Sequence, residues 1–231
     1  MRIGINCIQL DPDYVGGQNV FVFGLVEGFS KLIVDHHFIL IVKPSNKSFF
    51  EKYFLLNNFS VFLYDDRAFF QRIAWRLSTF SLDIGWKGLH LLINSFFFSK
   101  LSEKLDEACD LIYTPTTVLF PYKSKKASVL SMHDIQHIHY PQFFSSKTLS
   151  FRRIMYESSV ESLTYLQASS EFMKKDFLNY FSSVKQEQVV VISEGVDMNR
   201  FQDTCETDYL KSKYPIPEDF LFYPVVKVLF P

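Results

Sequence analysis

The stretch RIGINCIQLDPDYVGGQNVFVFGLVEGF, residues 2–29, decides the fold class of this chain. Arg2–Leu10 is apolar enough to form a buried strand, and Asp11–Gly17 carries the Asp, Pro and paired Gly of a loop. From Gln18 to Ile33, apolar side chains recur at helical spacing. A strand, a loop and a helix in this order predict the first unit of an α/β fold.

The segments that follow repeat this alternation. Phe38–Val42 is a continuous apolar run that ends at Lys43-Pro44, which is typical of a buried parallel strand. Ser48–Leu56 has a helical pattern, and Phe59–Tyr64 is predicted to be a third strand. The sequence therefore predicts a doubly wound, mostly parallel Rossmann-like sheet with helices on both faces.

The rest of the chain extends the same pattern. Arg67–Ala108 is predicted to form two helices, separated at Gly85 and Gly88. Further strands are predicted at Asp110–Tyr113, Ser128–Met132, Tyr165–Ser169 and Val189–Ile192, and further helices at Ser146–Leu166 and Ser170–Phe181. Ser170 is a residue type that favours the N-cap position of a helix.

Composition excludes several classes of protein. The chain has 231 residues, of which 48% are hydrophobic, and a net charge of −1, so it is globular and lacks the basic field that holds a nucleic acid. Its three cysteines, Cys7, Cys109 and Cys205, lie far apart and predict neither a disulfide framework nor a zinc site, which favours a reducing cytosol. Its apolar runs are far shorter than the roughly 20 residues of a membrane-spanning helix.

Near residue 206 the regular alternation of predicted strands and helices ends, which predicts a domain boundary. Pro215 and Pro217 precede the apolar run Phe220–Tyr223, as a linker precedes a new strand. We expect one Rossmann-like domain over residues 1–206, a linker over 207–219, and in 220–231 the remnant of the first strand of a second domain.

The paired glycines Gly16-Gly17 are the first candidate site. They lie between the first strand and its helix, where doubly wound folds bind their ligands. A glycine backbone can approach a phosphate closely, and the helix that follows offers free N–H groups. The alternative is a tight turn that requires a positive φ.

The second candidate is MHDIQHIHYP, residues 132–141, which follows a predicted strand at the same edge of the sheet. His133, Asp134, His137 and His139 could bind sugar hydroxyls or act in catalysis. They could also form a metal site, or a packed cluster of structural hydrogen bonds. Pro141 and the preceding strand favour a loop here.

Other features have plainer interpretations. Ser193–Asp197 is either a ligand-binding turn or a plain turn into the linker. The lysines near Tyr122 and at 174–175 are predicted to be a solvated surface, and the alternative is a contact with acidic lipid head groups or a diphosphate. Phe96-Phe97-Phe98 is predicted to be core rather than a membrane wedge.

Together these pieces resemble the N-terminal, acceptor-side domain of a family 4 glycosyltransferase with the GT-B fold. The resemblance rests on Gly16-Gly17 and on HDIQHIHYPQFFS (133–145), ASSEFMKKDF (168–177) and VVVISEGVDMNRF (189–201), in this order. It implies retaining transfer of a sugar from a nucleotide-sugar to a lipid-linked or polysaccharide acceptor, in the cytoplasm or at the inner face of the membrane.

The resemblance also assigns roles to residues. It implies that Gly16 and Gly17 lie near the donor diphosphate and that His133 and Asp134 are catalytic. It implies an acceptor-binding role for His137, Ser170 and Glu171, and it implies no metal and no cofactor.

One departure from the family is large. The Arg and Lys clamp and the Glu-x7-Glu motif that hold the donor in this family have no counterpart in residues 220–231. We therefore expect a truncated enzyme with little or no turnover alone. The alternatives are a non-catalytic module that binds the acceptor or a separate C-terminal chain, and a metal-dependent hydrolase that uses the histidine cluster.

Overall fold

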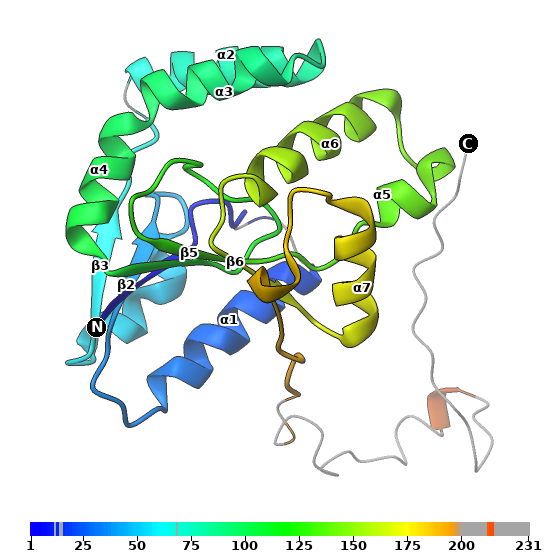
Figure 1. Ribbon diagram of the computed structural model, residues 1–231. Helices are drawn as coiled ribbons and strands as arrows, with labels where there is room; N and C mark the ends of the chain where they lie inside the picture. Colours follow the sequence, from blue (N-terminus) through cyan, green and yellow to red (C-terminus); the bar gives the residue numbers. More distant parts are fainter. Residues whose placement is uncertain (12, 14–15, 68, 197, 199–211, 215–231) are drawn as a thin grey trace. The chain divides into compact units, whose positions relative to one another are not determined.

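In the part of the chain that the structure describes, seven parallel strands form a single sheet in the order β3-β2-β1-β4-β5-β6-β7 (Figure 1). The strands are β1 (Arg2–Asn6), β2 (His37–Val42), β3 (Phe59–Leu63), β4 (Leu111–Thr114), β5 (Ala127–Ser131), β6 (Tyr165–Ala168) and β7 (Val189–Val191). The strand order reverses between β1 and β4, so the chain winds in both directions from the centre of the sheet. The predicted doubly wound α/β fold is confirmed.

The structure is a computed structural model that describes residues 1–11, 13, 16–67, 69–196, 198 and 212–214. Met1–Glu194 form one compact unit, which contains the whole sheet, and Gly195–Pro231 form a second. Apart from residues 212–214, the predicted linker and the predicted strand at Phe220–Tyr223 lie outside the described residues.

Helices cover both faces of β1 and β2. The side chains of a strand alternate between its two faces, so the continuous apolar run of β2 places apolar side chains on both. Phe38, Leu40 and Val42 pack with α1 (Gly17–Ser30) and the 3-10 helix η1 (Lys47–Leu55). Ile39 and Ile41 pack on the other face with α2 (Phe69–Asp83) and α4 (Ser99–Ala108).

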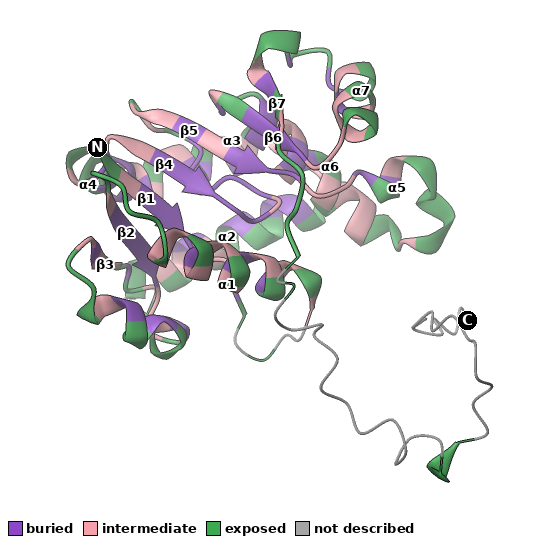
Figure 2. Cartoon of the chain, turned by 90° about the horizontal axis from the view of Figure 1, so that it is seen from below, coloured by how far each residue is buried: buried purple, intermediate pink, exposed green. Residues whose placement is uncertain are grey.

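A third core lies beyond β4. Leu130 and Leu166 of β5 and β6 pack with α6 (Ser146–Val160) and α7 (Glu171–Tyr180). Figure 2 shows buried residues along the central strands, with exposed residues on the outer sides of the helices. All three cores thus lie against the one sheet, and its strand ends are held rigidly.

Several predicted boundaries are wrong. The first strand ends at Asn6 rather than Leu10, because the Asn46 amide donates to the carbonyl oxygens of Cys7 and Leu10 and turns this segment away from the sheet. Predicted helix 48–56 is a 3-10 helix, and predicted helix 146–166 ends at Val160.

Residues 67–108 form three helices rather than the predicted two. Gly85 separates α2 from α3 (Lys87–Phe97) and has φ +71°. At this turn the Trp86 N–H donates to the Ser81 carbonyl and ends α2. Gly88 breaks nothing and lies inside α3. The next break falls at Phe98, before α4, and glycine plays no part in it.

Candidate functional site

His133 lies at the carboxyl end of β5 and is held from three sides. Its Nδ1 is 3.3 Å from Oε1 of Glu194, and its Nε2 is 3.3 Å from the carbonyl oxygen of Pro115. Its ring meets the ring of Phe21 edge-on, with 4.9 Å between the centroids. The ends of β4, β5 and β7 and the start of α1 therefore meet at this imidazole.

Glu194 is positioned by a buried hydrogen-bond network on β4, β5 and β6. The Gln167 side-chain Oε1 accepts from the hydroxyls of Tyr113 and Ser131, at 2.7 Å each. Its Nε2 donates to the carbonyl of Ile192, two residues before Glu194. Burial raises the pKa of Tyr113 to about 12, so this phenol stays protonated and keeps donating.

The Asp134 carboxylate forms no hydrogen bond with the neighbouring described residue His133. Its Oδ1 accepts from the backbone N–H of Gln136 at 3.1 Å, which fixes the start of the short helix α5 (Gln136–His139). The same oxygen lies 3.7 Å from Nη1 of Arg152 on α6. Asp134 therefore ties its loop to α6, and the carboxylate beside His133 comes from Glu194.

His137 lies in α5 and is 3% exposed. Its ring packs edge-on against Tyr156 on α6, and neither ring nitrogen has a hydrogen-bond partner among the described residues. Burial, with the charge of Arg152 as a second cause, lowers the pKa of His137 to about 4. Since α5 begins only at Gln136, His133 and His137 do not share a helical face.

Gly16 and Gly17 lie at the N-terminus of α1. Gly16 is in an extended conformation with φ −152°, so the alternative of a turn with positive φ is wrong for it. Gly16 has no side chain to cap α1, and among the described residues no atom lies within 4 Å of a Cβ placed on Gly17. No described residue therefore covers the first turn of the helix on the Gly17 side.

Ser170 and Glu171 lie at the carboxyl end of β6, at the start of α7. The Ser170 hydroxyl accepts from the backbone N–H of Met173 at 3.2 Å, which confirms its predicted N-cap position. Glu171 follows it in the first turn of α7 and is exposed. The structure uses Ser170 as a cap, and an acceptor-binding role for either residue stays a prediction.

A cleft of about 660 Å³ opens beside these loops. Residues that follow β1, β2, β3 and β4 form one wall, among them Gln9, Lys43, Asp66 and Thr117. Arg152 and Tyr156 of α6, which contact the Asp134 and His137 loop, line the cleft as well. The cleft therefore lies at the carboxyl edge of the sheet, beside the start of α1, where Gln18 also lines it.

A neutral histidine, His90 of α3, forms the inner wall of this cleft. The Ser78 hydroxyl lies 3.1 Å from its Nδ1, and the Tyr122 hydroxyl lies 3.1 Å from its Nε2. Burial lowers the pKa of His90 to about 4, so the ring is uncharged at neutral pH. This network joins α2, α3 and the loop before β5 into one rigid wall.

Sequence reasoning missed the contacts between elements. Glu194 was expected to belong to a turn that either binds a ligand or leads into the linker, and its contact with His133 was not predicted because β6 separates the two strands. Arg152 lies mid-helix and has no motif around it. The one usable signal was position, since Glu194, His133 and Thr117 all follow strands at the same edge of the sheet.

Two further findings concern metals and membranes. Within the described residues, no group of three or more His, Cys, Asp or Glu side chains is arranged to hold a metal ion. Among the helices in the described part of the chain, none combines the length and hydropathy needed to cross a bilayer.

No protein-family model matches the sequence, and no curated protein matches it either. The case for a function therefore rests on the arrangement of side chains at the carboxyl edge of the sheet.

Proposed function

We propose that this chain is the acceptor-side domain of a glycosyltransferase, and that its cleft binds the acceptor for retaining sugar transfer from a nucleotide-sugar. The observation that carries the proposal is the position of His133, which lies at the carboxyl edge, 3.3 Å from a carboxylate oxygen, with its ring against the first turns of α1. Ligands of doubly wound folds bind at this edge.

The spacing along α1 supports a shared donor site. Phe21, which contacts His133, lies four residues beyond Gly17, or about one helical turn of 5.4 Å. A diphosphate held by the open N-terminus of α1 would therefore bring its attached sugar close to His133. In this scheme Gly16 and Gly17 admit the diphosphate, and His133 contacts the transferred sugar.

The cleft supplies groups suited to a polar acceptor. Gln9, Thr117 and Thr148 can hydrogen-bond hydroxyl groups, and Lys43 and Arg152 can hold an anionic group on a lipid-linked glycan. Trp75 and Phe151 offer apolar faces on which a sugar ring can pack. Asp134 acts here by holding Arg152 and the loop after β5, so its role is one of positioning.

The donor half of the proposal can be tested by calorimetric titration of the purified chain with uridine and guanosine diphosphates. Gly17→Val adds a side chain in open space at the ligand side of α1, so we expect it to weaken binding at least about tenfold while the fold persists. Gly24→Val is the matched control, because Gly24 is equally open but lies in the middle of the same helix. Equal loss in both variants, or no binding by the wild type, would contradict the donor site.

A non-catalytic binding module is the second candidate. Among the described residues, those that line the cleft all fall between Ile8 and Tyr156, within the first compact unit. Calorimetric titration with nucleoside diphosphates and with glycan acceptors separates the two functions. Nucleoside diphosphate binding that Gly17→Val weakens, together with acceptor binding, supports the glycosyltransferase domain, and acceptor binding without nucleotide binding supports the module.

A further inference from the structure

The hairpin formed by α2 and α3 packs with its polar side inward. The buried positions of α2 are mostly small or polar, and those of α3 include a histidine and an asparagine. They are Ala74, Ser78, Ser81 and Leu82 in α2, and His90, Ile93 and Asn94 in α3. A helix that only covers a core shows the opposite pattern, with its large apolar side chains buried.

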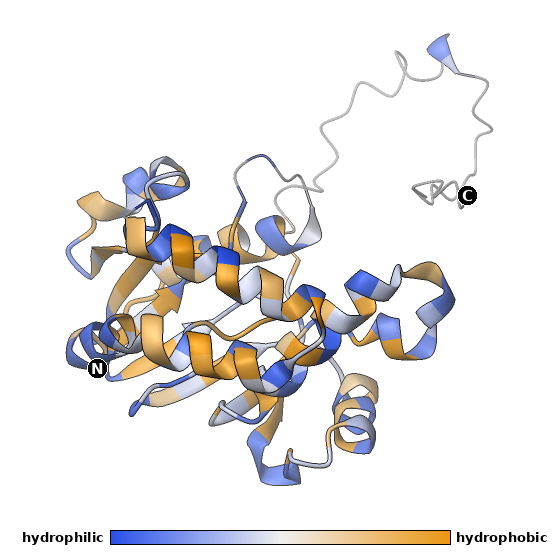
Figure 3. Cartoon of the chain, turned by 90° about the horizontal axis from the view of Figure 1, so that it is seen from above, coloured by the Kyte–Doolittle hydropathy of each residue, from blue (hydrophilic) through white to orange (hydrophobic). Residues whose placement is uncertain are grey.

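The large apolar side chains of this hairpin point outward instead. Eight of them among the described residues are 41–74% exposed: Phe69, Phe70, Leu77, Phe80, Ile84, Trp86, Leu92 and Phe96. Positions 77 and 80 of α2 and position 84, which directly follows this helix, recur at helical spacing, as 92 and 96 do in α3. Figure 3, which looks down on the hairpin, shows hydrophobic bands along both helices.

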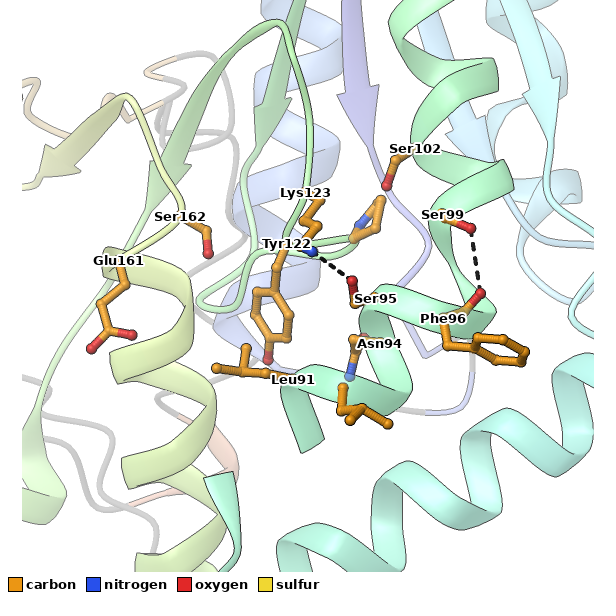
Figure 4. A pocket seen from close by; sticks show the side chains of 12 residues that line it. Leu91, Asn94, Ser95, Phe96, Ser99, Ser102, Tyr122, Lys123, Glu161 and Ser162 are labelled. Carbon is orange, nitrogen blue, oxygen red and sulfur yellow. Dashed lines mark hydrogen bonds between the residues drawn. The ribbon is translucent and has the colours of Figure 1, made fainter. Parts of the chain in front are cut away.

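This exposed face continues into a groove of about 860 Å³ (Figure 4). Leu92 and Phe96 of α3 line it, together with Lys123 from the loop before β5. The Lys123 ammonium donates to the hydroxyl of Ser95 at 2.5 Å, on the same helix as the two apolar residues. The groove therefore combines apolar walls with the ammonium of Lys123 and with Glu161, whose carboxylate pairs with Lys87.

The remaining charges of the hairpin are basic. Asp83 is paired with Lys147, and Lys87 with Glu157 and Glu161. Arg72 and Arg76 are exposed and form no ion pair with any described residue. A surface with exposed Phe, Trp and Leu beside unpaired Arg is the combination that binds anionic bilayers.

We propose that the α2–α3 hairpin lies in the headgroup region of an anionic lipid bilayer, with its eight exposed apolar side chains inserted. With 15 and 11 residues, the two helices are too short to span a bilayer and are suited to lie along its surface. The proposal does not depend on sugar transfer, since it rests on the hairpin alone.

Cosedimentation of the full chain with vesicles tests this surface. We expect binding to equimolar phosphatidylglycerol and phosphatidylcholine, and at least about tenfold weaker binding to phosphatidylcholine alone. The double variant Leu92→Ser/Phe96→Ser should bind the mixed vesicles at least about tenfold more weakly, because it removes two inserted side chains. Arg72→Gln/Arg76→Gln should weaken binding to the mixed vesicles by a similar factor and flatten its salt dependence.

Leu55→Ser is the matched control, because Leu55 is 86% exposed on η1, away from the hairpin. It should bind the mixed vesicles as the wild type does, and unchanged circular dichroism of every variant shows that the fold persists. Equal loss in Leu55→Ser, or no binding by the wild type, overturns the proposal. The proposal is also overturned if the wild type is a dimer that does not bind vesicles and if Leu92→Ser/Phe96→Ser dissociates this dimer. The hairpin is then an interface between two copies of the chain.

Discussion

Two buried histidines, His90 and His137, are uncharged for the same reason but differ in what surrounds them. Burial lowers the pKa of each to about 4, from 6.5 in the unfolded chain. His90 faces the hydroxyls of Ser78 and Tyr122, whereas the ring nitrogens of His137 have no hydrogen-bond partner among the described residues. Substitution by phenylalanine should therefore have opposite effects at the two positions.

His137→Phe should maintain or raise the free energy of unfolding at pH 7, because it removes two unpaired buried nitrogens and keeps a ring against Tyr156. In the wild type, the unfolded state binds more protons than the folded state between pH 6.5 and 4, so stability falls as pH falls through this range. His137→Phe lacks this loss. The difference in free energy of unfolding between the variant and the wild type should therefore grow in favour of the variant by about 1–2 kcal/mol when the pH is lowered from 7 to 5. Urea unfolding at the two pH values measures it.

His90→Phe is the contrasting variant in the same experiment. It removes the ring partner of the Ser78 hydroxyl and leaves the Tyr122 hydroxyl with only the weak acceptor Sδ of Met155, so it should cost about 1–3 kcal/mol at pH 7. Equal destabilisation by the two substitutions would mean that His137 has polar partners in solution.

Gly4 of β1 shows how a strand residue can be restricted by a neighbouring side chain. A Cβ at this position would lie 2.6 Å from the Cys109 sulfur, which is fully buried, and 3.0 Å from Cδ1 of Ile41. Gly4→Ala should therefore lower the free energy of unfolding by about 1–3 kcal/mol. In a thermal or urea double-mutant cycle, Cys109→Ala should recover part of this loss, and strictly additive effects would contradict the packing argument.

At the level of elements, α1 and the α2–α3 turn use glycine in different ways. Gly24 lies in the interior of α1 with open space around its Cβ position, so Gly24→Ala should stabilise the chain by about 0.5–1 kcal/mol. Gly85 has φ +71°, and a Cβ there would lie 3.2 Å from the Ser150 hydroxyl, so Gly85→Ala should cost about 1–2 kcal/mol. Melting curves of both variants test the contrast, and the same sign for both would contradict it.

The strands and the order of elements could be predicted from sequence because continuous apolar runs and loop residues are local signals. The error at the end of the first strand arose because one side chain acts on a distant backbone. Asn46 ends β1 from 36 residues away through the Leu10 carbonyl, and no pattern around Leu10 indicates this. The apolar run 96–98 was predicted to be core, which is correct for the buried Phe98 and wrong for the 74% exposed Phe96.

The candidate site could be predicted in position but not in contacts. Parallel strands place every residue that follows them at one edge, so His133 and the start of α1 could be expected near each other. Which carboxylate reaches His133 depends on the hydrogen bond from Gln167 to the Ile192 carbonyl, and this contact spans 25 residues. Local sequence therefore favoured the adjacent Asp134, whose side chain instead contacts Gln136 and Arg152.

At the scale of the whole molecule, the proposed cleft and the proposed lipid surface lie on opposite sides of the same hairpin. Ser78 and His90 line the cleft from its inner side, and Phe80 and Leu92 are exposed on its outer side. An acceptor with a lipid anchor would then meet the cleft close to the bilayer that holds it. The inward-facing polar residues of the hairpin would contact the acceptor, and its exposed apolar residues would insert into the bilayer.

The seven-stranded sheet and all three hydrophobic cores lie within Met1–Glu194, which predicts that this unit folds without the residues that follow it. A chain ending at Val196 retains Glu194 beside His133 and should melt in one cooperative transition close to that of the full chain. A chain ending at Gln188 is the control. It removes β7, exposes the β6 edge and loses the buried Val189, and should be destabilised by at least about 3 kcal/mol. Loss of cooperative melting in the chain ending at Val196 would show that the sheet needs residues beyond this unit.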